Sequence, residues 1–265
     1  LTSAAAANTG LPAGIPVVAA GHDTQFAVVG ACAREGEAIL SSGTWEILML
    51  RDPNYRANQV GYKEGVLIEL DAQPGLWNPQ LLMMASGVLE WLRDMIYPEL
   101  ADRPDAYEVM VNEARQVPPG SNGVIVLPSF EPSTGPNKKY ATSGTLLGLE
   151  LATTRGHLYR AALEGLSCQL RQAAEVLHEA TGYNIWALRV VGGGSKNPLW
   201  NQIRADVTGL PIVTTAQKEA TVVGAAAFAF VGAGFYDTIV EAQEAMRAAE
   251  EVIEDGRTGT LVPSG

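Results

Sequence analysis

The sequence from Val190 to Asn197 reads Val-Val-Gly-Gly-Gly-Ser-Lys-Asn and joins an apolar run to a helix start. The run Ala187–Val191 is typical of a strand, and Pro198 suits the first turn of a helix expected over residues 198–208. Glycine lets a ligand approach the backbone, and a helix N-terminus offers free amide groups. The stretch therefore predicts a nucleotide-binding turn within an α/β fold.

Other interpretations of this turn depend on the residues around it. A dinucleotide site of the Rossmann type would continue Gly192-x-Gly194-x-x with glycine or alanine, but Asn197 occupies that position. The turn also does not open a strand-helix-strand unit with an acidic residue at the required distance, and the Walker pattern Gly-x-x-x-x-Gly-Lys-Ser/Thr does not occur. A tight turn that needs glycine only for its backbone shape is the remaining alternative.

A second turn carries a carboxylate. Residues 20–24 read Ala-Gly-His-Asp-Thr, after an apolar, partly β-branched run over 15–19 and before a segment of helical composition over 26–33. A strand, a glycine turn and a helix start are expected here. The helix N-terminus favours the ionised form of Asp23, which could accept a proton from a hydroxyl group. The alternative is that Asp23 only caps the helix.

The remaining pattern predicts one α/β domain with a mixed sheet, because strands come first and then alternate with helices. Residues 118–140 are rich in Pro, Gly, Ser and Asn and are expected to form a loop or lid. The small residues over 224–227 would allow a close approach to the sheet. Strands are expected over residues 17–20, 38–42, 45–51, 65–71, 123–127, 187–191 and 211–214, and helices over 2–8, 26–33, 81–98, 105–117, 154–180, 198–208, 220–233 and 239–251.

Composition excludes some classes of partner. The 265 residues carry a formal net charge of -11, which argues against nucleic acid or an anionic membrane as partner. Without a basic cluster, a phosphate ligand would need backbone amides and a metal ion for its neutralisation. Cys32 and Cys168 are expected to be buried free thiols in a reducing cytoplasm. We see no signal peptide and no apolar stretch of membrane-spanning length, so a cytoplasmic protein is expected.

Several stretches together resemble one family. Gly-His-Asp-Thr at 21–24, Ser-Gly-Thr at 42–44 and the glycine turn at 192–197 occur in the order found in the FGGY carbohydrate kinases. Between them, Gly-Thr-Leu-Leu-Gly-Leu at 144–149 and His-Leu-Tyr-Arg-Ala-Ala-Leu-Glu at 157–164 resemble a further motif of that family. The resemblance covers nearly the whole chain apart from the last dozen residues.

The resemblance implies a ribonuclease H-like (actin-like ATPase) C-terminal domain over residues 1–265, with a mixed sheet flanked by helices. An N-terminal sugar-binding domain with a phosphate loop is expected to be absent from this sequence. ATP and a sugar would bind between the two domains, and a phosphoryl group would pass to a sugar hydroxyl with Mg²⁺. L-Fuculose, converted to L-fuculose 1-phosphate, is the expected ketose, with rhamnulose or xylulose as alternatives.

The same resemblance assigns roles to residues. One domain alone supplies only one wall of the site between the two domains. It is expected to be inactive, because positioning and electrostatics supply most of the rate in phosphoryl transfer. A second hypothesis is therefore an inactive nucleotide-binding or oligomerisation module that assembles as a homo-oligomer. The implied roles are Asp23 as general base, Gly43, Thr44, Gly87, Glu90, Gly193, Gly194 and Asn197 as nucleotide contacts, and Thr24 and Gln25 as sugar contacts.

Overall fold

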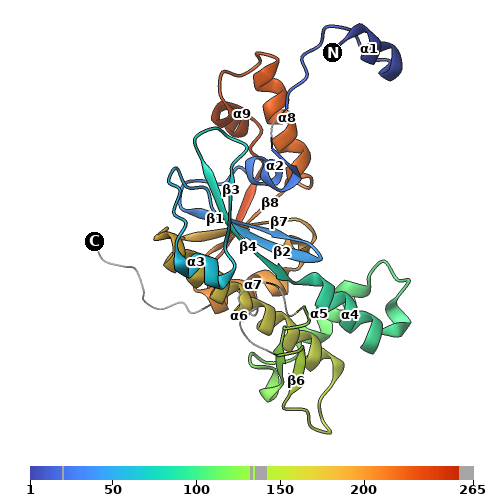
Figure 1. The fold of residues 1–265 in the computed structure, drawn as a ribbon. Coiled ribbons are helices and arrows are strands. Elements are labelled where there is room, and N and C mark those ends of the chain that lie inside the picture. The colour runs from blue at the N-terminus through green and yellow to red at the C-terminus, as the bar shows by residue number, and fades with distance from the viewer. Residues whose placement is uncertain (20, 132–133, 135–141, 257–265) are drawn as a thin grey trace.

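A mixed, seven-stranded sheet forms the centre of the computed structural model, which describes residues 1–19, 21–131, 134 and 142–256 (Figure 1). The strand order is β3-β4-β2-β1-β7-β8-β9; β7 runs parallel to β1 and β8, and the other pairs are antiparallel. A separate hairpin pairs β5 with β6. The strands are β1 (Glu37–Ser42), β2 (Trp45–Met49), β3 (Leu67–Leu70), β4 (Trp77–Met84), β5 (Ile125–Leu127), β6 (Thr145–Leu147), β7 (Ala187–Val191), β8 (Ile212–Thr215) and β9 (Glu250–Ile253).

Helices cover both faces of the sheet. In Figure 1, α2, α8 and α9 lie on one side, and α3, α6 and α7 lie on the other, with α4 and α5 beyond one end of the strands. The helices are α1 (Ser3–Thr9), α2 (Asp23–Gly30), α3 (Gln59–Glu64), α4 (Ser86–Ile96), α5 (Ala106–Arg115), α6 (Arg155–Thr181), α7 (Pro198–Thr208), α8 (Ala220–Gly232) and α9 (Ile239–Ala245), with short 3₁₀ turns η1 (Pro98–Leu100), η2 (Ser121–Gly123) and η4 (Gly193–Lys196).

The period of two along each strand separates two cores. Leu40 and Leu48 belong to one buried cluster with Leu170 of α6. Ile39 and Met49, their neighbours in the chain, belong to the opposite cluster with Val28 of α2. The central strands are therefore apolar on both faces, as expected for a sheet covered twice.

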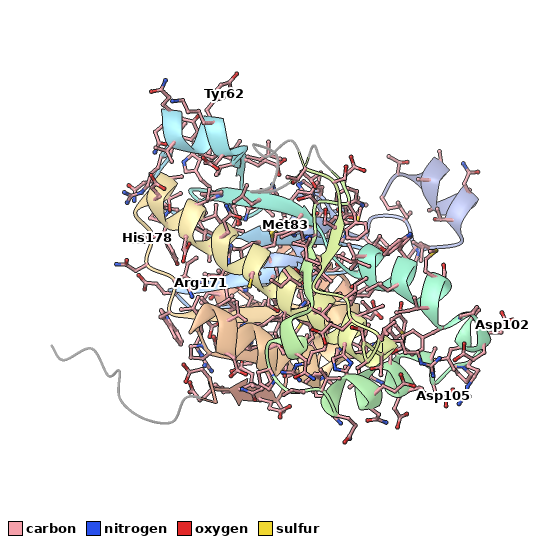
Figure 2. All side chains as sticks on the ribbon, turned by 90° about the horizontal axis from the view of Figure 1, so that it is seen from below. Tyr62, Met83, Asp102, Asp105, Arg171 and His178 are labelled. Carbon is pink, nitrogen blue, oxygen red and sulfur yellow. The ribbon has the colours of Figure 1, made fainter. Side chains whose placement is uncertain are left out.

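Helix α6 confirms the longest helix predicted from the sequence. Its stripe of Ala162, Leu166, Leu170, Ala173 and Leu177 is buried, and Gly182 ends the helix with a left-handed φ of 69°. Figure 2 shows Met83 in the interior, whereas Arg171 and His178 project outward from α6. Cys168 lies on the exposed side of α6. The expectation that both cysteines are buried is thus wrong for Cys168 and confirmed for Cys32.

Helix α8 makes its close approach to α2, so the predicted approach of residues 224–227 to the sheet is wrong. A Cβ atom at Gly224 would overlap the carbonyl oxygen of Phe26, and a Cβ atom at Gly30 would overlap that of Ala220. Glycine at both crossing points lets the two backbones touch. The small residues therefore serve helix-helix packing.

The strand predicted before Asp23 is also wrong. Residues 15–19 lie outside every strand of the described sheets, and the side chain of Val17 is 72% exposed. A β-branched run becomes a strand only where its backbone groups find a partner strand. Ala20 lies outside the described residues.

Two further boundaries differ from the predictions. The helix predicted from Leu81 begins only at Ser86, because residues 77–84 form β4 between β2 and β3. The last predicted helix ends at Ala245, and β9 follows it along β8. At residues 81–84 an apolar run fits either period, and in both places pairing with neighbouring strands decides the outcome. Helix α3 and strand β6 were not predicted.

Of the loop predicted over residues 118–140, positions 132–133 and 135–140 lie outside the described residues. The described part contains η2 and β5, the latter as predicted. Within the described ranges, no helix combines the length and the apolar character that crossing a membrane would require.

Candidate functional site

The first part of the site is the turn between β1 and β2. Gly43 donates its amide to the carbonyl of Trp45 at 2.9 Å, which closes the hairpin. The carbonyl of Thr44 accepts the amides of Ala85 and Gly87, each at 3.1 Å. These contacts satisfy amides at the start of α4, which would otherwise lack partners. The turn and the helix therefore hold each other in place.

Gly87 fits against Thr44 because it has no side chain. A Cβ atom there would lie 2.7 Å from Sδ of Met84 and 3.3 Å from Cγ2 of Thr44. Gly87 thus supports Thr44, and Glu90, one turn further along α4, reaches the cavity described below.

The second part is the glycine turn between β7 and α7. Gly192 has a φ of 88°, and a Cβ atom there would lie 2.6 Å from the carbonyl oxygen of Ser42. A Cβ atom at Gly194 would overlap the hydroxyl of Ser42. Asn197 caps α7 by accepting the amide of Trp200 at 3.0 Å. The two turns, about 150 residues apart in the chain, are therefore in direct contact.

A cavity of about 510 Å³ opens beside both turns. This volume is in the range of sites that bind small molecules and cofactors. Helices α4, α5, α6 and α7 supply the rest of its wall. Five of the predicted nucleotide residues line it, namely Gly43, Glu90, Gly193, Gly194 and Asn197.

Sequence reasoning missed several lining residues. Lys196 and Arg115 bring positive charge to the cavity, and Tyr107, Tyr159 and Trp200 bring aromatic rings. Lys196 lies inside the glycine turn and could have been found from that motif. The residues of α5 carried no such signal, because packing against α6 decides which face of a short helix meets a cavity.

Asp23 lies elsewhere. It is the first residue of α2, while His22 occupies the N-cap position without a side-chain capping bond. The side chain of Asp23 is 86% exposed, and its Oδ1 accepts the amide of Thr24 at 2.8 Å. That hydrogen bond, with a smaller effect from His22, lowers the pKa of Asp23 below its usual value. The carboxylate is therefore ionised at neutral pH.

The neighbours of Asp23 tie α2 to the edge strand β3. Nε2 of His22 lies 2.9 Å from Oε2 of Glu69, and this hydrogen bond raises the pKa of His22. The buried amide of Gln25 donates to the carbonyl of Leu70 at 2.5 Å, while Thr24 is partly exposed beside Asp23. None of Asp23, Thr24 and Gln25 is among the residues that line the cavity in the described part of the chain.

Known proteins with similar sequences indicate the family to which this site belongs. The chain is 42% identical over 243 residues to L-fuculokinase from Escherichia coli strain K12, covering 92% of this chain and 49% of that protein. L-fuculokinase from Haemophilus influenzae is 36% identical over 90% of this chain and 49% of its own length. The chain thus spans about half the length of the curated relatives it matches.

A solved structure shares the fold. Xylulose kinase from Rhodospirillum rubrum superposes with a TM-score of 0.82 at 28% identity, covering 97% of this chain and 50% of that one. The expected actin-like ATPase fold with a mixed sheet flanked by helices is confirmed. The family described as the FGGY family of carbohydrate kinases, C-terminal domain, matches residues 38–233. With both turns and the cavity inside that range, the chain belongs to the FGGY family of carbohydrate kinases.

Proposed function

We propose that this chain is the nucleotide-binding part of an ATP-dependent kinase that converts L-fuculose to L-fuculose 1-phosphate. The observation that carries the proposal is the cavity in which Gly43, Glu90, Gly193, Gly194 and Asn197 meet. Relatives named L-fuculokinase at 42% and 36% identity support the choice of sugar over rhamnulose and xylulose.

ATP would bind with its phosphates near the two turns. Close approach of the phosphates to the backbone is possible at Gly193, where a Cβ atom would meet nothing within 4 Å. Lys196 and Arg115 supply positive charge from the cavity wall. The aromatic rings of Tyr107 and Trp200 offer surfaces for the base. Thr44 would contact the phosphates, with Gly87 holding it in position.

Asp23 would act on the sugar. Its ionised carboxylate accepts the proton of the attacking hydroxyl while the sugar oxygen bonds to the γ-phosphorus. The bond from that phosphorus to the bridging oxygen breaks, and ADP leaves with the bond electrons. Thr24 would contact the sugar beside Asp23, and Gln25 would fix the start of α2 through Leu70.

Mg²⁺ would enter with the nucleotide. Among the described residues, no group of three or more His, Cys, Asp or Glu side chains could hold a metal ion. Phosphate oxygens and water would therefore be its main ligands, a mode that Mg²⁺ commonly uses. When bound, the ion offsets charge on the phosphates, and the residues named above position the nucleotide.

The test uses the full-length protein that contains this chain. We expect ADP release with L-fuculose at a higher kcat/KM than with L-rhamnulose or D-xylulose. Asp23→Asn should lower kcat at least about 10³-fold, because a positioned base is lost, and should leave ADP affinity within about twofold. Asp237→Asn, an exposed aspartate before α9, is the matched control.

Three outcomes separate the hypotheses. Undiminished turnover in Asp23→Asn would contradict the assignment of the base. Preference for another ketose would contradict the choice of sugar. Calorimetry on the 265-residue chain should detect ATP binding, and an assay of ADP should detect no sugar-dependent release from that chain alone. Absence of sugar-dependent ADP release from the full-length protein as well would favour the hypothesis of a module without catalytic function.

A further inference from the structure

A buried polar cluster lies directly behind the two turns. Ser42 and Glu46 flank the first turn, and the hydroxyl of Ser42 donates to Oε1 of Glu46 at 2.7 Å. Arg204 of α7 donates to Oγ of Ser42 at 2.8 Å and also to Oε1 of Glu46. The side chains of Arg204 and Glu46 are 0% and 1% exposed. The first turn is therefore tied to α7 through one guanidinium group.

The same guanidinium reaches the second turn. Nη1 of Arg204 lies 3.4 Å from the carbonyl oxygen of Gly194 and 3.0 Å from Oδ1 of Asn201. Asn201 in turn donates to the carbonyl of Ser195 at 2.7 Å. Cζ of Arg204 also lies 3.6 Å from the centre of the Trp200 ring, which forms part of the cavity wall.

We infer that Arg204 is a positioning residue. Through Ser42, Glu46 and Asn201 it fixes the distance between the turn that joins β1 to β2 and the glycine turn that joins β7 to α7. This inference deepens the proposed function and rests on it, because the spacing matters only if one nucleotide contacts both turns. Arg204 does not line the cavity, so it acts through the groups that do.

Stability alone is a poor explanation for this ion pair. Replacing a buried ion pair by packed apolar side chains is often neutral or stabilising, because both charges lose their hydration. The geometry points instead to orientation. A planar guanidinium offers several donors in fixed directions, and here they reach acceptors from both turns at once.

A second buried ion pair in the same sheet, between Arg189 and Glu37, serves as the comparison. Arg189 of β7 pairs with Glu37, the first residue of β1, at 2.7 Å, and both side chains are 0% exposed. Arg189 also pairs with Glu250 of β9 at 2.9 Å. Arg189 lies three residues before Gly192, and Glu37 lies five residues before Ser42, so the pair of Arg189 and Glu37 is outside both turns. Its loss should cost stability without disturbing the site.

The experiment compares two double replacements in the 265-residue chain. Arg204→Met with Glu46→Leu removes the cluster charges together, and Arg189→Met with Glu37→Leu removes the comparison pair. Neither variant leaves a carboxylate unpaired, because Glu250 keeps its ion pairs with Arg247 and Arg34. ADP affinity by calorimetry should fall at least about tenfold in the first, since displaced binding groups are costly, and stay within about twofold in the second. Equal affinities in the two variants would overturn the inference.

Conservative single changes and a ligand-free readout complete the test. Arg204→Lys keeps the positive charge but loses the planar guanidinium group with its several donors, so it should weaken ADP binding several-fold. Full ADP affinity in Arg204→Lys would contradict the role of the guanidinium shape. Hydrogen exchange without nucleotide should be faster at the amides of residues 43–45 and 193–197 in the Arg204 variants only. Unchanged exchange there would contradict the inference, whereas failure of the unmodified chain to bind ADP would contradict the proposed function.

Discussion

At the scale of single residues, two neighbouring glycines in one turn have different structural roles. A Cβ atom at Gly194 would overlap Oγ of Ser42, whereas a Cβ atom at Gly193 would meet nothing within 4 Å. The sequence motif does not distinguish Gly193 from Gly194. Only the contact between the turns tells which glycine is required for packing and which leaves room for a ligand.

This difference predicts opposite results for two alanine variants. Gly194→Ala should lower the free energy of unfolding by about 1–3 kcal/mol, the usual cost of overpacking, and should weaken ADP binding. Gly193→Ala should leave unfolding nearly unchanged, because its new methyl group points into open space, and should weaken ADP binding if phosphates approach there. Urea denaturation and calorimetry measure both, and equal destabilisation would contradict the packing model.

The pair of His22 and Glu69 predicts a pH dependence. The hydrogen bond that the His22 ring donates to Glu69 raises the pKa of His22 in the folded state, so the protonated ring favours folding. This contribution is complete below the unfolded pKa of about 6.5 and is lost as the pH rises through the higher folded value. In Glu69→Gln, an NMR titration of His22 should show a lower pKa. Glu251→Gln on β9 is the control, and an unchanged titration in Glu69→Gln would contradict the prediction.

At the scale of elements, α2 depends on α8 for its position. Their close crossing requires Gly224, where an added methyl group would overlap the carbonyl of Phe26. Because α2 begins at Asp23, the packing of α8 against Phe26, three residues further along, affects the position of the proposed base.

Gly224→Ala should therefore lower the free energy of unfolding by about 1–3 kcal/mol, although alanine is the better helix former. Gly61→Ala in α3 is the matched control, since its methyl group would meet neighbours at an ordinary 3.5 Å. It should be neutral or stabilising by up to about 1 kcal/mol. Thermal and urea unfolding distinguish the two, and stabilisation by Gly224→Ala would show that the helices can separate at little cost.

At the scale of the whole molecule, β9 completes the sheet at one edge. Ile253 packs against the core on the α6 side, whereas the next residue back, Val252, is 55% exposed. Ile253→Asp should detach β9 and lower the free energy of unfolding by about 2–4 kcal/mol, because a charge would face apolar side chains.

Detachment would also expose the edge of β8, a template for pairing with another chain. Sedimentation should then detect self-association of Ile253→Asp, while Val252→Asp should stay like the unmodified chain and lose less than about 1 kcal/mol. Equal stability of the two variants would show that β9 contributes little to the sheet.

The sequence by itself determined the elements that carry their own local signals. The α6 stripe, the α7 start at Pro198 and the glycine turn follow from periodicity, capping and backbone freedom, which act within a few residues. The motif order also indicated the family, and most of the nucleotide residues it implied meet at one cavity.

Tertiary structure decided the rest, because the forces involved act between distant segments. Residues 77–84 became a strand through pairing on both sides, and residues 15–19 did not, for want of a partner. Arg115 and Tyr107 reached the cavity through the orientation of α5. Above all, the contact between the turns depends on Arg204 holding Glu46 and Gly194 together, since a buried charge must find its partners wherever the chain places them.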